Sequence, residues 1–372
     1  MKQPIYNNKS IKESAMLILF DTLNVYYLPQ YVPIIEQLKL RHHQVKLVCY
    51  SNKNDQQAFS EVINDLDVEC IWVNNTQQAK LAYLSLKADW IFFGNKFEFL
   101  DEVHQHSKTA QLGHGVGPKP SYYHKSKTPM TVRFIEGDLR LTKIKEYYPK
   151  DKFIQVGFSK LDPMFNHTQP EGDLAELGLD PNKPTILYAP TFNPSSLECF
   201  PDNWPEDFRE YNILIKPHSL TQVREKYKKQ RQKLAKWSIF DNVYVAKEQD
   251  ISLLPFMKNA DILLSEASST LFEFAALNKP VIVCNFFKLK WSYRGIFKYR
   301  FYNRFGKDNV LYSEIGLHVN NYTALIKAIP QQLAHPEQYA ANREIYTNEH
   351  VGPTDGKASE RIVQYLENAP SS

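Results

Sequence analysis

Short, wholly apolar stretches alternate along the chain with longer stretches in which apolar residues recur at helical spacing. Near the start, apolar strands are predicted at 16–20 and 45–50, on either side of a helix predicted at about 28–40. Strands that are apolar throughout are typical of a parallel sheet covered by helices on both faces. The alternation continues through "VECIWV", a helix near 77–86 and "ADWIFFGN", which indicates a doubly wound α/β domain.

The alternation begins again after a polar segment at 157–184, which is rich in proline and glycine as linkers are. It runs from "TILYAPTF" through "YNILIKPH" and "ADILLS" to "KPVIVCN". We therefore predict two Rossmann-like, doubly wound domains that face a central cleft, where the loops after the strands bind ligands. The predicted divisions are an N-terminal domain at 1–165, a C-terminal domain at 166–350, and a closing helix and tail at 351–372.

Composition is compatible with this prediction, because 372 residues are enough for two ordinary domains and 43% of them are hydrophobic. The four cysteines have no metal-like spacing, and Cys49 and Cys284 lie in predicted strands. Buried free thiols in a reducing compartment are therefore expected. The N-terminus lacks the apolar run of a secretory signal, so we expect a cytoplasmic protein.

Charge is unevenly distributed, although the formal net charge is only +4. The segments 224–237 and 288–307 are strongly basic, and the second is interleaved with aromatic residues. Such a mixture predicts contact with an anionic membrane surface, and the alternative is a partly buried loop with one solvated face. Nucleic acid can use the same mixture, but that interpretation leaves the cleft histidines described below without a purpose.

A run of small hydroxylic residues follows the apolar strand predicted at 262–264. Backbone amides at the start of the next helix, predicted at 271–277, are open there to bind an anion such as a diphosphate. Glu273 lies one turn beyond Ser269 and is placed to reach ribose hydroxyls. The alternative is a capping box of Thr270 and Glu273, which explains one hydroxyl and the glutamate but not the other hydroxyls. The candidate ligand-binding residues of this run are Ser265, Glu266, Ser268, Ser269, Thr270 and Glu273.

Two histidines that follow predicted strands are the candidate catalytic residues. His218 projects from the sheet edge after "NILIKP", beside Lys216, and can donate a hydrogen bond to a phosphate. His114 lies in "LGHGVGPK", where closely spaced glycines indicate unusual torsions, and it can take a proton from a hydroxyl. A structural histidine and a flexible turn are the respective alternatives. The other candidate substrate-binding residues are Gly115, Lys119 and Thr191, the last of which follows "YAP".

In this order, the motifs resemble those of the CDP-glycerol glycerophosphotransferase family, the teichoic-acid primases and polymerases, which have a GT-B fold. "SEASS" with the later "LNKPVI" is similar to the family's "TDYSS" and "LNKPII". "YAPTF" resembles "YAPTW", "KPHS" resembles "KPH", and "GHGVGPK" resembles "WHGTPLK", with Gly113 in place of tryptophan and Val116 in place of threonine. The segment 355–366 also resembles the family's closing helix.

The resemblance implies that the second domain binds CDP-glycerol or a similar CDP-linked alditol. The residues that it places on the diphosphate are Ser268, Ser269, Thr270, Thr191 and His218, while Glu273 would bind the ribose. His114 would be the general base for an acceptor hydroxyl that attacks the glycerol-bearing phosphorus and expels CMP. The implied acceptor is a lipid-linked or cell-surface glycan at the cytoplasmic face of the inner membrane. No tightly bound cofactor is implied, and participation of Mg²⁺ is left open.

Two other functions remain as alternatives. A GT-B glycosyltransferase or epimerase that uses a UDP-sugar needs the same two domains and the same hydroxylic helix start. A non-enzymatic RNA- or membrane-binding protein with a vestigial site would need only the basic segments. Motifs typical of other enzyme classes are missing, because the sequence contains no HExxH, no GxxxxGK[ST] and no GxSxG.

Overall fold

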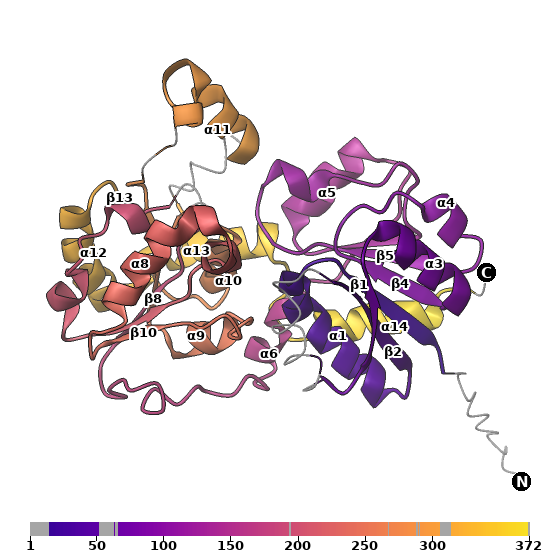
Figure 1. Ribbon diagram of the computed structural model, residues 1–372, viewed down its shortest axis with the longest axis horizontal. Helices are drawn as coiled ribbons and strands as arrows, with labels where there is room; N and C mark the ends of the chain where they lie inside the picture. The colour runs from indigo at the N-terminus through magenta and orange to yellow at the C-terminus, as the bar shows by residue number, and fades with distance from the viewer. Residues whose placement is uncertain are drawn as a thin grey trace, which may run out of the picture.

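Two parallel sheets, each covered by helices, form two domains that lie side by side (Figure 1). The structure is a computed structural model, and it describes residues 15–51, 63, 66–192, 195–266, 268–287, 289, 291–305 and 314–370. Within these residues, no helix is long and apolar enough to cross a bilayer.

The first sheet has seven strands in the order β3-β2-β1-β4-β5-β6-β7, all paired in parallel. The order reverses at β1, so loops that bind ligands gather at the carboxyl ends of the strands. The strands are β1 Leu17–Thr22, β2 Gln44–Tyr50, β3 Glu69–Val73, β4 Trp90–Phe93, β5 Lys108–Leu112, β6 Val132–Ile135 and β7 Phe153–Gln155. The helices of this domain are α1 Leu28–Leu40, α3 Thr76–Leu86, α4 Leu100–Val103 and α5 Asp138–Tyr147.

The second sheet has six parallel strands in the order β10-β9-β8-β11-β12-β13. Its strands are β8 Thr185–Tyr188, β9 Asn212–Ile215, β10 Val243–Val245, β11 Ile262–Ser265, β12 Val281–Cys284 and β13 Leu317–Val319. Its helices are α7 Ser219–Val223, α8 Lys228–Trp237, α9 Leu254–Asn259, α10 Ser269–Ala275, α11 Lys298–Phe305 and α12 Tyr322–Ala334. The short helix α6 Asp162–Phe165 lies in the segment between the sheets.

The alternation of apolar and amphipathic segments in the sequence gives this architecture directly. All four residues of β4, β8, β9, β11 and β12 are buried, as expected for strands covered on both faces. The helix predicted at 28–40 is α1, and Cys49 and Cys284 are buried free thiols as predicted. The helix predicted at 271–277 begins two residues earlier, at Ser269, because Ser268 caps it.

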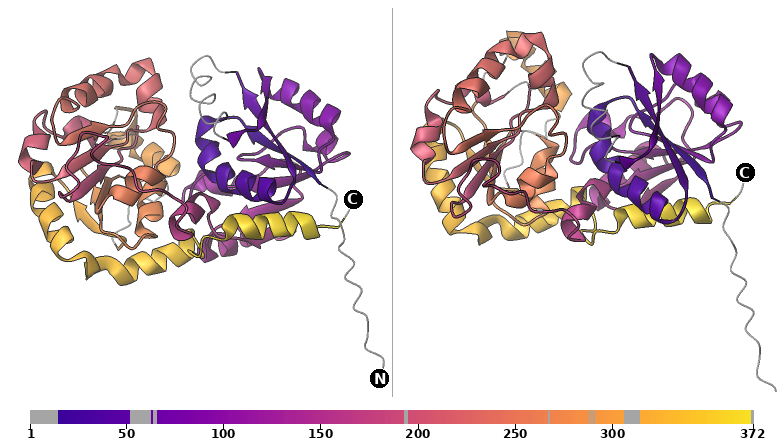
Figure 2. Two further views of the ribbon diagram at one scale, coloured as in Figure 1. Left: turned by 90° about the horizontal axis from the view of Figure 1, so that it is seen from below. Right: turned by 60° about the horizontal axis from the view of Figure 1, so that its bottom comes forward.

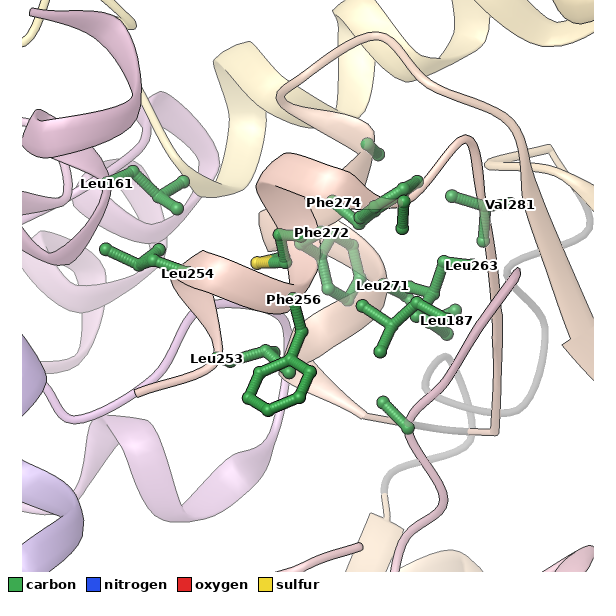
Figure 3. Packing of buried hydrophobic residues seen from close by; sticks show 14 of the residues in the cluster. Leu161, Leu187, Leu253, Leu254, Phe256, Leu263, Leu271, Phe272, Phe274 and Val281 are labelled. Atoms are coloured by element: carbon green, nitrogen blue, oxygen red, sulfur yellow. The ribbon is translucent and has the colours of Figure 1, made fainter. Parts of the chain in front are cut away.

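One hydrophobic cluster joins the two domains. It combines Val116 of the first domain, Leu161 of the connecting segment, and Leu254 and Phe272 of the second domain. Figure 3 shows Leu161 beside Leu254, with Phe272 to the right of both. Because this cluster is continuous, packing fixes how the loops at the facing edges of the two sheets meet.

The end of the chain runs back beneath both domains, as Figure 2 shows for helices α13 Ala340–His350 and α14 Ala358–Asn368. Ile362 and Val363 of α14 are buried in the same cluster as α1. The carboxylate of Asp162 accepts hydrogen bonds from the amides of Ala358 at 3.0 Å and Ser359 at 2.7 Å. The connecting segment therefore holds the first turn of the last helix.

We expect Asp162→Ala to lower the free energy of unfolding by about 1–3 kcal/mol, because two buried amides at the start of α14 lose their acceptor. Urea unfolding at neutral pH measures this change. Asp173→Ala is the matched control, since Asp173 accepts from Ala175 N at 2.8 Å on the exposed surface. An equal, small effect for both variants would contradict a special role for Asp162.

Candidate active site

The glycine loop after β5 meets the start of α10 across the domain boundary. A Cβ atom built on Gly115 would lie 3.5 Å from the hydroxyl oxygen of Ser269. A Cβ atom built on Gly117, whose φ is +106°, would lie 2.8 Å from the ring of Phe272. Two segments that the sequence singled out separately are therefore in contact, and at position 117 only glycine allows so close an approach.

His114 lies on this loop as a neutral base. Its Nδ1 is 3.1 Å from the carbonyl oxygen of Gly94, which only accepts hydrogen bonds, so Nδ1 carries the proton and Nε2 keeps its lone pair. Burial, together with the positive charges of Arg140 and Lys119, lowers the pKa of His114 to about 4, although the hydrogen bond to Gly94 opposes the shift. The rings around the imidazole, with their centroid distances, are Tyr26 at 5.6 Å, Tyr27 at 5.3 Å and Tyr122 at 5.6 Å.

His218 has the opposite tautomer. It is the N-cap of α7, and its Nδ1 accepts a hydrogen bond from the amide of Leu220 at 3.1 Å. The proton of the neutral ring is therefore on Nε2, which makes that atom a donor. Burial, together with the positive charges of Lys119, Lys216 and Arg224, lowers the pKa of His218 to about 4.

Cationic side chains from both domains surround the two histidines. The charge of Lys119 in the first domain lowers the pKa of both imidazoles, so Lys119 lies within electrostatic reach of both. Burial lowers the pKa of Lys216 to about 8, with Asp250 opposing this shift and Lys160 adding to it. Lys160 and Arg224 were missed by the sequence analysis, because one lies in a polar linker and the other in a long basic run.

The hydroxylic run surrounds the start of α10. Ser268 Oγ accepts from the amide of Thr270 at 3.3 Å, and Ser268, Ser269 and Thr270 are all half-buried at the domain boundary. The capping-box alternative is wrong, because Ser268 rather than Thr270 is the N-cap. Glu273 does not turn back toward the cap. It is 2% exposed, and its Oε2 accepts from Lys160 Nζ at 2.6 Å.

Ser265 and Glu266 lie beneath the loop that carries Thr191. Ser265 Oγ donates to the carbonyl oxygen of Ala189 at 2.7 Å. Glu266 is 2% exposed and accepts from the amides of Thr191 at 2.7 Å and Ser196 at 2.6 Å. Their oxygens already bond within the protein, so in this structure they support the loop after β8. That the twelve site residues named from the sequence bind or act on a substrate stays a prediction.

A separate cavity of about 320 Å³ opens between α1, the segment 163–170 and the segment 251–254. Its walls are mostly apolar, and Glu36 is its acidic member. None of the sequence-predicted site residues lines it. We therefore assign the candidate site to the histidines and lysines at the domain boundary.

His350 should make stability depend on pH. Its ring lies against Phe272 at 4.6 Å, and burial lowers its pKa from 6.5 to about 4. The unfolded chain therefore binds a proton below about pH 6.5 that the folded chain does not bind until about pH 4. We expect the free energy of unfolding to fall as pH drops through this window, and His350→Gln to remove about 1–3 kcal/mol of that fall.

Urea unfolding between pH 7.5 and 4.5 tests this expectation. His335→Gln, at an exposed histidine on the same part of the chain, is the control and should leave the pH dependence unchanged. A His350→Gln variant with the wild-type pH dependence would show that the imidazole is protonated equally in both states.

Comparison with known proteins places these observations in a family. The family model for CDP-Glycerol:Poly(glycerophosphate) glycerophosphotransferase matches residues 142–368. The teichoic acid glycerol-phosphate primase of Bacillus spizizenii (strain ATCC 23059 / NRRL B-14472 / W23) is 25% identical over 252 residues, which are 63% of this chain and 57% of that protein. The primase of Bacillus subtilis (strain 168) is 23% identical over 232 residues, with coverage of 60% and 54%. The matched residues span just over half the length of these relatives.

Solved structures confirm the GT-B fold. A structure of the wall teichoic acid polymerase TagF has a TM-score of 0.65 at 15% identity and covers 94% of this chain and 88% of that one. A putative UDP-N-acetylglucosamine 2-epimerase from Listeria monocytogenes has a TM-score of 0.61 at 11% identity, with coverage of 95% and 96%. These likenesses show the fold alone, whereas the family match rests on sequence. The chain belongs to the CDP-glycerol:poly(glycerophosphate) glycerophosphotransferase family.

Proposed function

We propose that this chain transfers glycerol phosphate, or a related alditol phosphate, from a CDP-linked donor to an acceptor hydroxyl and releases CMP. The acceptor that we propose is a lipid-linked or cell-surface glycan. Family membership supports the CDP-linked donor. The observation that carries the proposal is the pair of neutral imidazoles, one on a loop of each domain, with opposite tautomers.

In the proposed reaction the two imidazoles have different roles. His114 Nε2 takes the proton of the acceptor hydroxyl while its oxygen forms a bond to the glycerol-bearing phosphorus. The bond from that phosphorus to the bridging oxygen breaks, and CMP leaves with the electron pair. His218 donates from Nε2 to a phosphate oxygen and stabilises the charge that develops there. Such a transfer depends mainly on positioning and on electrostatic stabilisation.

In the proposal, cationic side chains offset the negative charge of the donor's diphosphate. Lys119, Lys216 and Lys160 bring positive charge from both domains to the site of the diphosphate. The hydroxyls of Ser268, Ser269 and Thr270 add donors on the α10 side. In the proposal, Glu273 would exchange its bond with Lys160 for the ribose hydroxyls. We derive no step through Mg²⁺, and a loss of transfer on chelation would show that the ion takes part.

The direct test is incubation of the protein with CDP-glycerol and a membrane-extracted acceptor, followed by measurement of CMP. We expect CMP release, and we expect His114→Ala to reduce it about 10²–10⁴-fold because the general base is lost. His218→Ala should reduce it about 10²–10³-fold, because a donor to the developing charge is removed.

His104→Ala is the control, since His104 is a half-buried histidine of the first domain that bonds Thr109 away from the cleft. Its rate should stay near that of the wild type. Release of UDP from UDP-sugars, without CMP from CDP-glycerol, would replace the proposal with the glycosyltransferase or epimerase alternative. Full turnover by the His114 variant would remove that residue as the base.

We further propose that the chain reaches its acceptor by binding the anionic cytoplasmic surface of the inner membrane. Helix α11 projects from the body of the second domain (Figure 1). Trp291 and Ile296, just before it, are 85% and 84% exposed. Arg294, Lys298 and Arg300 are exposed nearby, which suits the boundary between headgroups and acyl chains. Residues 288, 290 and 306–307 of the predicted basic segment lie outside the described residues.

Charge reversal tests this surface. The triple variant Arg294→Glu, Lys298→Glu, Arg300→Glu should weaken binding to vesicles that contain phosphatidylglycerol by about 100-fold, at about 1 kcal/mol for each lost cation. The control makes the same charge change at three exposed positions around the start of α8, in the triple variant Lys226→Glu, Lys228→Glu, Lys229→Glu. It should weaken vesicle binding much less. An equal loss of vesicle binding in both triple variants would show that binding depends on net charge and not on the surface around α11.

A further inference from the structure

A buried arginine holds the loop that carries His114. Arg140 lies on α5 and is 2% exposed. Its Nη1 donates to the carbonyl oxygen of Gly115 at 3.0 Å, and its Nη2 donates to the carbonyl oxygen of Tyr122 at 3.1 Å. The planar guanidinium thus connects the residue after the histidine to the tyrosine that packs against it. Lysine has no such fork and cannot make both bonds from fixed positions.

Glu136 completes the arrangement from the end of β6. It is 1% exposed, and its Oε2 accepts from Arg140 Nη1 at 2.5 Å. Its Oε1 lies against the residue before the histidine: a Cβ atom built on Gly113 would be 2.6 Å from Oε1 and 2.9 Å from Arg140 Nη2. The ion pair therefore occupies the space that any side chain at position 113 would need. This explains why position 113 is glycine in this chain.

The pair also controls the neighbour of the imidazole. The guanidinium carbon of Arg140 lies 5.1 Å from the centre of the Tyr122 ring, and that ring lies 5.6 Å from the His114 ring. The hydroxyl of Tyr122 would be 2.5 Å from a Cβ atom on Gly115. Residues on both sides of His114 thus rest on the same two side chains, while the carbonyl oxygen of Tyr122 is shared between Arg140 and Arg133.

Stability alone does not account for such a pair. Removing two charges from water costs several kcal/mol, and a well-packed apolar replacement is often neutral or stabilising. An ion pair with both partners buried gains its value from geometry, because the fork and the carboxylate fix the direction of every bond that they make.

We propose that Glu136 and Arg140 are positioning residues that fix the glycine loop so that His114 Nε2 faces the acceptor hydroxyl. This inference rests on the proposed function for its kinetic consequences. Its structural content, a loop held by one guanidinium, is independent of the substrate.

The kinetic test compares Arg140→Lys with Arg343→Lys. Arg343 on α13 is also buried and also donates to carbonyl oxygens, at 3.2 Å to Asn278 and 2.6 Å to Pro336, but it lies outside the site. We expect kcat of Arg140→Lys to fall about 10²-fold, as misplacement of a reacting group by about 1 Å can cause, with little change in KM for the donor. Arg343→Lys should keep its kcat. A wild-type kcat for Arg140→Lys, or an equal loss for both variants, would overturn the proposal.

Hydrogen exchange at the amides of residues 113–117 provides a readout without substrate. We expect exchange at least tenfold faster in Arg140→Met and in Glu136→Gln, and unchanged exchange in Arg343→Lys. Unchanged exchange in both site variants would overturn the proposal. If Arg140→Met does not fold, Glu136→Gln, which keeps the shape of the side chain, gives the result.

Histidine NMR distinguishes positioning from general destabilisation. The groups that face His114 are Arg140, Lys119, Tyr26, Tyr27 and Tyr122. The pKa of His114 should rise in Arg140→Met, which loses a positive neighbour, and stay near its wild-type value in Arg343→Lys. If the wild type releases no CMP from CDP-glycerol, the proposed function fails while exchange and NMR still test the positioning pair.

Discussion

Close contact between the glycine loop and α10 is the constraint on which the cleft depends. Gly117 has a φ of +106°, and its Cα lies so near the Phe272 ring that a Cβ atom would be 2.8 Å away. Val116, beside it, is 1% exposed and belongs to the core that the two domains share. The loop that carries His114 is therefore seated in the second domain, and the distance between the two histidines is set by packing rather than by either sheet alone.

Within this cleft, neutral imidazoles lie near cationic side chains. Burial and neighbouring cations keep both histidines neutral, one as an acceptor and the other as a donor. Lys119 and Lys216 add positive charge beside these imidazoles. Desolvation thus acts on both kinds of group, because it keeps the imidazoles neutral and also lowers the pKa of Lys216 to about 8.

Buried carboxylates give the site its rigidity. Glu266 holds the loop after β8 by two amides, Asp162 holds the start of α14, and Glu136 orients Arg140 behind the glycine loop. Glu266 and Asp162 accept short hydrogen bonds from groups far along the chain, whereas the partner of Glu136 lies only four residues later. Such contacts restrain loops that the parallel sheets leave at their carboxyl ends, where the candidate site residues lie.

The sequence alone determined the elements and the edge of each sheet where the candidates lie. Apolar strands and helical periodicity are local properties, so the two domains, the helix at 28–40 and the loops with His114 and His218 were predictable, as were the motifs in family order. Partners were not. Glu273 pairs with Lys160, 113 positions earlier, and Glu266 turns inward to residues about 70 positions away. Arg140 beneath the glycine loop has no local signal either, because a surface helix with a charged residue reads the same whether that residue is solvated or buried. Such pairings exist only once the chain has folded, since they depend on which groups lose their water together.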